Sequence, residues 1–221
     1  MEMSQLRERL DEVIFMGLMG VTIPIPECQQ AVRLPAGTVN WSEDEFFHFC
    51  QINRDLRIER TAKGEIIIMS PASGYSGFQS GQAFAQLNAW AIKDGNGAAF
   101  DSSTGFLLPT GGMRAPDAAW VRLSRLRKLS RREKQQFLPL CPDFAIEVAS
   151  PSDRAADLTE KMEEYRTAGL PLGWLILPAT KQVEVHTAAG VDVLASPERV
   201  TADPVLPGFT LELGPIWDPP F

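Results

Sequence analysis

Hydrophobic and polar side chains alternate most regularly over residues 143–149. Phe144, Ile146 and Val148 occupy one set of positions, and Glu147 lies in the middle of the other set. Because successive side chains of a strand point to opposite faces, this pattern predicts a β-strand. The neighbours of Glu147 on its own face are both alanines, which leaves space around the carboxylate.

A helix is predicted directly after this strand. A Ser-Pro-Ser sequence interrupts the strand, and Asp153 is expected to be the N-cap of the helix. Leu158, Met162 and Tyr165 fall on one apolar face at about 100° per residue. The acidic residues of the helix fall outside this face: Asp157, Glu160, Glu163 and Glu164. Lys161 lies at the edge of the apolar face, so the helix directs a lysine toward the strand that carries a glutamate.

A second acidic residue lies within a predicted strand. Asp117 belongs to a strand predicted at residues 113–121 and shares a face with Ala115 and Ala119. The small neighbours again leave space around a carboxylate. The sequence therefore predicts two mid-strand acids that are accessible to a ligand.

The remaining pattern predicts one α/β domain with a mixed sheet flanked by helices. Ser42 and Glu45 match a capping box, which starts a helix that runs to about residue 53. The further predicted elements are strands at 56–60 and 65–69, a helix at 77–93, strands at 104–108 and 174–177, and a meander over 181–187 and 191–194. The predicted order is α-β-β-α-β-β-β-α-β-β, and residues 196–221 are expected to be irregular.

Residues 1–40 are predicted to be an arm that precedes a domain of residues 41–221. A helix is expected over residues 3–19, and the prolines that follow it favour extended backbone. The arm is interpreted either as an appendage or as an oligomer contact, for example in a homodimer.

Composition excludes several classes of protein. The 221 residues are 44% hydrophobic and 22% charged, as is usual for globular proteins, and no apolar run approaches the roughly 18 residues of a membrane span. The three cysteines are scattered and form no Cys-x-x-Cys pair, which argues against a disulfide framework or a zinc site. The N-terminal region lacks the basic start of a secretory signal. A cytoplasmic protein that does not enter a membrane is expected.

The net charge of −7 argues against general polyanion binding, with the exception of residues 122–134. The basic side chains of this segment are Arg122, Arg125, Arg127, Lys128, Arg131, Arg132 and Lys134, and its one acid is Glu133. One interpretation is a solvated helix face beside an acidic site. The other is a patch that binds the phosphates of a nucleic acid.

The two acids and the lysine allow three interpretations. Asp117 and Glu147 on neighbouring strands would form a hard-oxygen site for Mg²⁺ or Mn²⁺, and Lys161 would stabilise charge on a phosphate. Alternatively, the three side chains form a buried ion network that joins sheet and helix. A third interpretation is a small-molecule hydrolase that uses the same carboxylates.

Three segments together resemble the Uma family of predicted endonucleases. They are Ala115-Pro116-Asp117; the run Pro142-Asp143-Phe144-Ala145-Ile146-Glu147-Val148-Ala149-Ser150-Pro151-Ser152; and Lys161, Tyr165 and Gly169 followed by Trp174-Leu175-Ile176-Leu177. This family, formerly classed as a domain of unknown function and common in cyanobacteria, belongs to the restriction-endonuclease-like PD-(D/E)XK superfamily. The resemblance covers residues 41–213 and is specific as a set, although each segment alone is a weak signal.

The resemblance implies a restriction-endonuclease-like core and Mg²⁺-dependent hydrolysis of DNA. Asp117 and Glu147 match the metal-binding acids, and Lys161 matches a catalytic lysine that this family carries on the helix. The superfamily pattern places that lysine two residues after the second acid, where this chain has Ala149. Glu59 matches an upstream catalytic glutamate, although its position in a hairpin is equally typical of an exposed residue. A non-catalytic member of the fold, acting as a nucleic-acid-binding protein or a scaffold, is the alternative.

Overall fold

A computed structural model describes residues 14–16, 21–23 and 31–221 of the chain. The chain divides into two compact units, Met1–Pro71 and Ala72–Phe221. The predicted boundary between an arm of residues 1–40 and a domain of residues 41–221 stays a prediction.

The first unit contains short antiparallel strands and one helix. Its elements are β1 (Ile14–Met16), β2 (Val21–Ile23), β3 (Ala31–Leu34), α2 (Glu43–Ile52), β4 (Arg57–Arg60) and β5 (Ile66–Met69). β1 pairs with β2, and β5 pairs with both β3 and β4. The predicted capping box is confirmed, because the Ser42 side chain accepts a hydrogen bond from the Glu45 amide while the Glu45 carboxylate accepts one from the Ser42 amide.

The helix predicted at residues 3–19 is wrong where the structure describes that range. Residues 14–16 form β1, in which Ile14 lies opposite Ile23 in an antiparallel pair. The other residues of the predicted helix lie outside the described part of the chain. Backbone pairing with a later segment outweighed the local helical period at this place.

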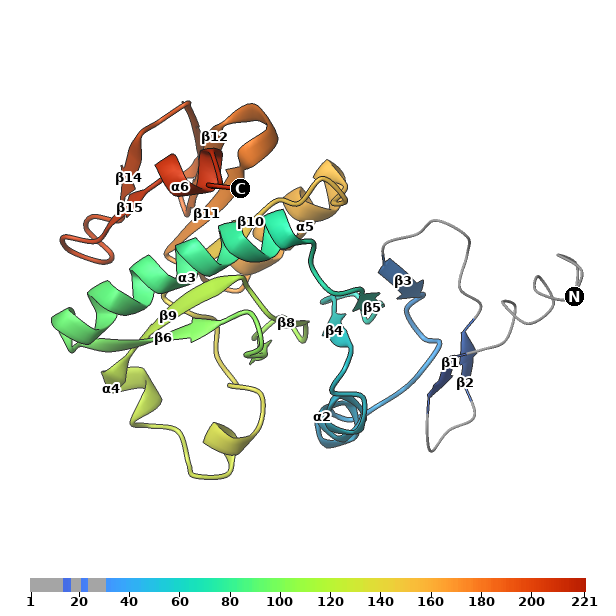
Figure 1. The fold of residues 1–221 in the computed structure, drawn as a ribbon. Helices are drawn as coiled ribbons and strands as arrows, with labels where there is room; N and C mark the ends of the chain where they lie inside the picture. Colours follow the sequence, from blue (N-terminus) through green and yellow to red (C-terminus); the bar gives the residue numbers. More distant parts are fainter. Residues whose placement is uncertain (1–13, 17–20, 24–30) are drawn as a thin grey trace, which may run out of the picture. The chain divides into compact units, whose positions relative to one another are not determined.

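The second unit is organised around a six-stranded mixed sheet with the order β13-β12-β11-β10-β9-β6 (Figure 1). The sheet strands are β6 (Gly97–Asp101), β9 (Ala118–Arg122), β10 (Phe144–Val148), β11 (Leu172–Leu177), β12 (Gln182–Thr187) and β13 (Gly190–Ala195). β10 and β11 are parallel and are joined by α5 (Ala155–Thr167), whereas the other neighbours are antiparallel. This arrangement confirms the prediction of a mixed α/β sheet with flanking helices.

The other elements of the second unit lie outside this sheet. They are α3 (Gly74–Asp94), β7 (Phe106–Leu107), β8 (Met113–Arg114), α4 (Leu123–Leu126), the 3-10 turns η1 (Glu133–Gln135) and η2 (Pro178–Thr180), β14 (Arg199–Thr201), β15 (Thr210–Glu212) and α6 (Gly214–Trp217). Figure 1 shows the long helix α3 lying across the sheet. Among the described residues, no helix combines the length and apolar character needed to cross a bilayer.

The two faces of β10 carry two separate hydrophobic cores. Phe144, Ile146 and Val148 pack in a cluster that includes α3 residues, among them Leu87. Ala145, between them in sequence, belongs to a second cluster that includes residues of α5. The predicted alternation of this strand is therefore confirmed, and Glu147 lies on the face that α5 covers.

Three strand predictions need correction. The strand predicted at residues 113–121 is two strands, β8 and β9, which belong to different sheets and are separated by Ala115-Pro116-Asp117. Proline cannot donate a ladder hydrogen bond, which favours a break at this place. β6 was not predicted because its sequence, GAAFD, alternates too weakly. The region after residue 195, expected to be irregular, contains the hairpin β14–β15.

Two side-chain predictions are also wrong. Asp153 is not the N-cap of α5, since Arg154 holds that position and the Asp153 carboxylate accepts hydrogen bonds from Ser150 instead. Alternation with Val185, beside Glu184, predicts that His186 is exposed, but its side chain is buried on β12, with 3.0 Å between His186 Nε2 and Glu184 Oε2.

Candidate functional site

Asp117 and Glu147 are neighbours at the end of the β9–β10 pair. Ile146 lies opposite Ala118 in the last pair of the antiparallel ladder, and Glu147 and Asp117 are the residues that come next beyond this pair. Asp117 Oδ2 also accepts a hydrogen bond of 2.9 Å from the backbone N–H of Val148. The structure therefore brings the two predicted acids together, although Asp117 lies just outside the strand rather than within it.

Two side chains of α5 hold the carboxylate of Glu147. Lys161 Nζ lies 2.8 Å from Glu147 Oε1, and the Tyr165 hydroxyl donates a hydrogen bond of 2.9 Å to the same oxygen. Lys161 and Tyr165 are four residues apart and so share one side of the helix. Glu147 is 4% exposed, Lys161 9% and Tyr165 0%. The predicted orientation of Lys161 toward this strand is confirmed.

The local charges give a physical reason for a buried lysine here. Two neighbouring carboxylates repel each other, and burial increases the cost because little water screens them. Lys161 compensates one of the two charges, which leaves these three groups with a net charge of −1. Such a group attracts a cation and has oxygen donors with which to bind it.

A second buried ion pair lies beside the first and was not predicted. Arg114 donates to Glu164 Oε2 through Nε (3.1 Å) and Nη2 (2.5 Å), and both side chains are buried. The interpretation of Glu164 as a residue outside the buried face of α5 is therefore wrong. Helical phase alone could not show this, because the covering segment around Arg114 is about fifty residues away in sequence.

Glu59 lies on β4 in the first unit and is only 2% exposed. The alternative that this hairpin glutamate is exposed is therefore wrong. The site around Asp117 and Glu147 consists of residues of the second unit. A catalytic role for Glu59 stays a prediction.

The basic segment of residues 122–134 is not one helix. It contains α4, a turn and the 3-10 turn η1, so its side chains do not share a single helical face. Two of its arginines have partners within the fold. Arg125 Nη1 lies 3.1 Å from Asp143 Oδ1, and Arg122 contacts the same carboxylate through its backbone N–H at 2.9 Å. Arg122 also donates to the Val205 carbonyl and lies over the Trp120 ring.

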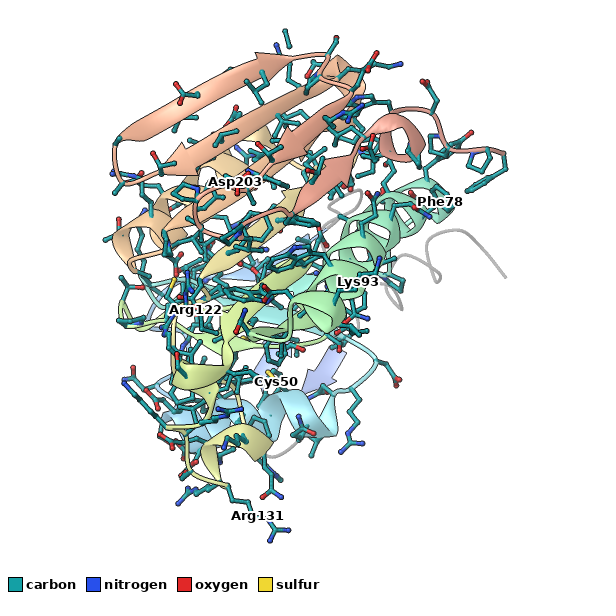
Figure 2. All side chains as sticks on the ribbon, turned by 90° about the vertical axis from the view of Figure 1, so that its left-hand side faces the viewer. Cys50, Phe78, Lys93, Arg122, Arg131 and Asp203 are labelled. Atoms are coloured by element: carbon teal, nitrogen blue, oxygen red, sulfur yellow. The ribbon has the colours of Figure 1, made fainter. Side chains whose placement is uncertain are left out.

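Other basic side chains of this segment extend into solvent. Arg127, Lys128, Arg131 and Arg132 are exposed, and Figure 2 shows the Arg131 side chain directed away from the ribbon. Within the described part of the chain, the side chains of Arg127, Lys128 and Arg131 form no hydrogen bond or ion pair. Nucleic-acid binding by these residues stays a prediction, and the structure distinguishes them from Arg122 and Arg125, which have partners in the fold.

The donor set of the site fits Mg²⁺ or Mn²⁺ better than a softer metal. In the part of the chain that the structure describes, no group of three or more His, Cys, Asp or Glu side chains could hold a metal ion. Mg²⁺ does not need such a cage, because it commonly uses one or two carboxylates and completes its shell with water and substrate phosphate. Asp117 and Glu147 supply two carboxylates of this kind.

The described cysteines do not provide a nucleophile. Burial raises the pKa of the Cys141 thiol to about 12, and it raises the pKa of the Cys50 thiol to about 12 as well. The thiolate, not the thiol, is the reactive form. Both side chains are therefore inert at neutral pH.

Comparison with known proteins identifies a family and similar solved structures. A family model described as "Uma2: Putative restriction endonuclease" matches residues 43–214. A solved structure from Anabaena variabilis ATCC 29413, described as "a putative nuclease belonging to DUF820", is similar with a TM-score of 0.64. The two chains are 19% identical over 80% of this chain and 98% of the other, so the likeness shows a shared fold. No curated protein matches the sequence.

Proposed function

The chain belongs to the Uma2 family of restriction-endonuclease-like proteins, and on this premise we propose that it hydrolyses phosphodiester bonds of DNA with Mg²⁺ or Mn²⁺. The observation that carries the proposal is the meeting of Asp117 and Glu147 at the end of the β9–β10 pair, where Asp117 Oδ2 accepts a hydrogen bond from the amide of Val148, the residue after Glu147. The Lys161 ammonium lies 2.8 Å from the second of these carboxylates. Two acids and a lysine at one point match the needs of phosphoryl chemistry, in which negative charge must be bound and then stabilised.

Asp117 and Glu147 would hold the cation through carboxylate oxygens. The cation, when bound, would polarise a phosphoryl oxygen and make a bound water more acidic. Tyr165 and Lys161 both contact Oε1 of Glu147, so this carboxylate is held in one orientation by two donors from a single helix. A fixed ligand needs less reorganisation when the cation and the phosphate arrive.

Lys161 would act on the phosphate as well as on Glu147. An ammonium group has three N–H donors, so one group can bind both a carboxylate and a phosphate oxygen. Its charge would be most valuable when negative charge increases on the phosphate in the transition state. Its burial strengthens this effect, because few water molecules compete for the ammonium.

The exposed basic side chains would bind the DNA backbone away from the reacting bond. Arg127, Lys128, Arg131 and Arg132 extend from the connection between β9 and β10, the two strands that carry or flank the acids. Phosphate contacts of this kind position a nucleic acid without reading its sequence. They also offset the acidic character of the rest of the chain.

The proposal is tested by nicking of supercoiled plasmid DNA in the presence of Mg²⁺, Mn²⁺ or EDTA. We expect nicking by the wild type only with a divalent cation, and at least a 10²-fold lower rate for Asp117→Asn. Asp192→Asn, on the exposed edge strand β13, is the matched control. Labelled DNA and RNA oligonucleotides tested in parallel identify the nucleic acid. Nicking that is equal in the wild type and Asp117→Asn, or that persists in EDTA, would refute the proposal.

The role of the basic segment is tested by the salt dependence of DNA binding. Each phosphate contact contributes about −0.9 to the slope of log K against log salt, so Arg127→Glu with Arg131→Glu should flatten the slope by about 2. Arg125 is left unchanged, because a glutamate there would face the carboxylate of Asp143. Lys93→Glu, an exposed change on α3, is the control. An unchanged slope in the double variant would show that the segment is a solvated surface that does not bind phosphates.

The same contacts also favour a second function, that of a non-catalytic scaffold. The Glu147–Lys161 pair joins sheet and helix directly, as an ion network with a structural role would. The two functions differ in the expected effect of a neutral side chain at position 147 on stability.

A further inference from the structure

The segment that carries Asp117 is not held by a strand of its own. Residues 115–117 lie between β8, which ends at Arg114, and β9, which begins at Ala118. The sheet ladder therefore does not fix the Asp117 backbone. Asp117 reaches the sheet through its side chain, which accepts the hydrogen bond from the Val148 amide.

Two contacts connect this segment to α5. Arg114, three residues before Asp117, forms the buried ion pair with Glu164. The Ala115 carbonyl lies 3.5 Å from Lys161 Nζ. Lys161 and Glu164 are three residues apart, so they are neighbours on the surface of the helix. The backbone before Asp117 and the helix that carries Lys161 are thus joined within one helical turn.

The Arg114–Glu164 pair has little reason to be present for stability alone. Burying two charges costs several kcal/mol per ion, and an apolar pair of similar volume is often at least as stable. In addition, Glu164 Oε1 is buried and has no hydrogen-bond partner among the described residues, which adds a further cost. What the pair does provide is a directional, two-pronged contact that permits one arrangement of the two elements.

We infer that Arg114 and Glu164 are positioning residues, which hold the Asp117 segment in place against α5 so that Asp117 and Lys161 meet at Glu147. Arg114 precedes Asp117 by three residues, and Glu164 lies one helical turn from Lys161, so the ion pair holds both the backbone of residues 115–117 and the helix. This inference deepens the proposed nuclease function and rests on it for its consequence in catalysis. The positioning itself does not depend on that function.

Amide hydrogen exchange of Val148 reports the positioning directly. This N–H donates to the Asp117 carboxylate, whereas the next amide, Ala149, donates to the Ile176 carbonyl of β11. If Asp117 moves, the Val148 amide loses its acceptor and the Ala149 amide keeps its own. The ratio of the two exchange rates therefore separates a local displacement from global unfolding.

The experiment compares Glu164→Gln, which keeps the shape of the side chain, with Glu164→Asp, which keeps its charge but shortens it. Glu163→Gln is the matched control, because Glu163 is exposed on the same helix and pairs with Arg166. We expect Val148 exchange to be at least 10-fold faster in both Glu164 variants, with Ala149 unchanged, and neither amide to change in the control. In the same variants, nicking at saturating Mg²⁺ should fall by about 10-fold or more.

The outcomes separate this inference from the proposed function. Equal acceleration of Val148 and Ala149, or no acceleration of Val148, would overturn the positioning role whatever the nicking assay shows. Selective acceleration of Val148 in a protein whose wild type does not nick DNA would support the positioning role and refute the nuclease. Selective acceleration without a fall in nicking would refute the link between position and catalysis. Should Glu164→Gln not fold, the charge-conserving Glu164→Asp gives the same readings.

Discussion

Glu147→Gln distinguishes a cation site from a structural ion network, because the two functions predict different stabilities. Glutamine has the shape of glutamate and can still accept the Tyr165 hydrogen bond, so the change removes charge and little else. In an ion network whose purpose is structural, loss of one partner leaves a buried charge uncompensated and costs about 3–5 kcal/mol. For a chain of this size that cost lowers the melting temperature by roughly 6–20 °C.

The geometry of the site leads us to expect a smaller effect in the absence of metal. The lost attraction between Lys161 and Glu147 at 2.8 Å is about 6 kcal/mol at an effective dielectric constant of 20. The change also relieves the repulsion from the Asp117 carboxylate, which opposes this loss. Removing a buried carboxylate also recovers several kcal/mol of desolvation. These contributions nearly cancel, and the Asp117 charge remains at the site, so the free energy of unfolding should change by about 1 kcal/mol or less.

Mn²⁺ should stabilise the wild type and should have no such effect on Glu147→Gln. A cation at 100 times its dissociation constant stabilises the folded protein by about 2.7 kcal/mol, which corresponds to a rise in melting temperature of roughly 5–11 °C. We expect this rise in the wild type and in Glu163→Gln, an exposed control, and its loss in Glu147→Gln. Melting curves by circular dichroism give the stability of metal-free Glu147→Gln relative to the wild type and the effect of Mn²⁺ on each of the three proteins. A fall of 3 kcal/mol or more in metal-free Glu147→Gln, together with no Mn²⁺ effect in the wild type, would refute the cation site.

Three further predictions concern the lysine of the site, the packing around a glycine and the reactivity of a buried thiol. Lys161→Ala should fold and bind Mn²⁺ but nick plasmid DNA at least 10²-fold more slowly in single-turnover assays. The control Lys181→Ala, which removes an exposed ion pair, should nick at the wild-type rate. Equal nicking rates for the wild type and Lys161→Ala would show that this lysine is not catalytic. Gly97→Ala should lower the free energy of unfolding by about 1–3 kcal/mol in urea titrations, because an added Cβ would lie 2.0 Å from the indole of a buried tryptophan. The control Gly77→Ala, in α3 with open space around it, should be neutral or stabilising. Equal stability of both variants would contradict the close packing at Gly97. The pKa of Cys141 is raised to about 12, so this thiol stabilises the folded state fully below about pH 9, and the contribution is lost as the pH rises toward 12. Because the thiolate is the reactive form, alkylation of Cys141 at pH 9, followed by mass spectrometry, should be on the order of 10²-fold slower in the native protein than in urea. Similar rates would show that the thiol is accessible.

The sequence by itself determined those features that depend on local periodicity and capping. The alternation around Glu147 predicted a strand with two different faces, and those faces carry the two cores of the second unit. The phase of α5 predicted that Lys161 turns toward the strand, and the ion pair of 2.8 Å agrees with it. The Ser42–Glu45 capping box is likewise a local pattern, with both of its hydrogen bonds spanning three residues. Such features are readable because every partner lies within one or two turns of the chain.

Only the tertiary structure decided which distant segments meet. The break between β8 and β9 depends on the two strands joining different sheets, which no local pattern in residues 113–121 reveals. The burial of Glu164 depends on Arg114, and the partnership of Arg125 depends on Asp143. A charged side chain is predicted from the sequence to be exposed, because burial of a charge is costly. The ion partner that reduces this cost is supplied by a remote part of the chain, so the local sequence does not show it. The two acids and the lysine were therefore predictable one at a time, whereas the ion pair that we infer to hold them in place became visible only once the fold brought Arg114 to Glu164 of α5.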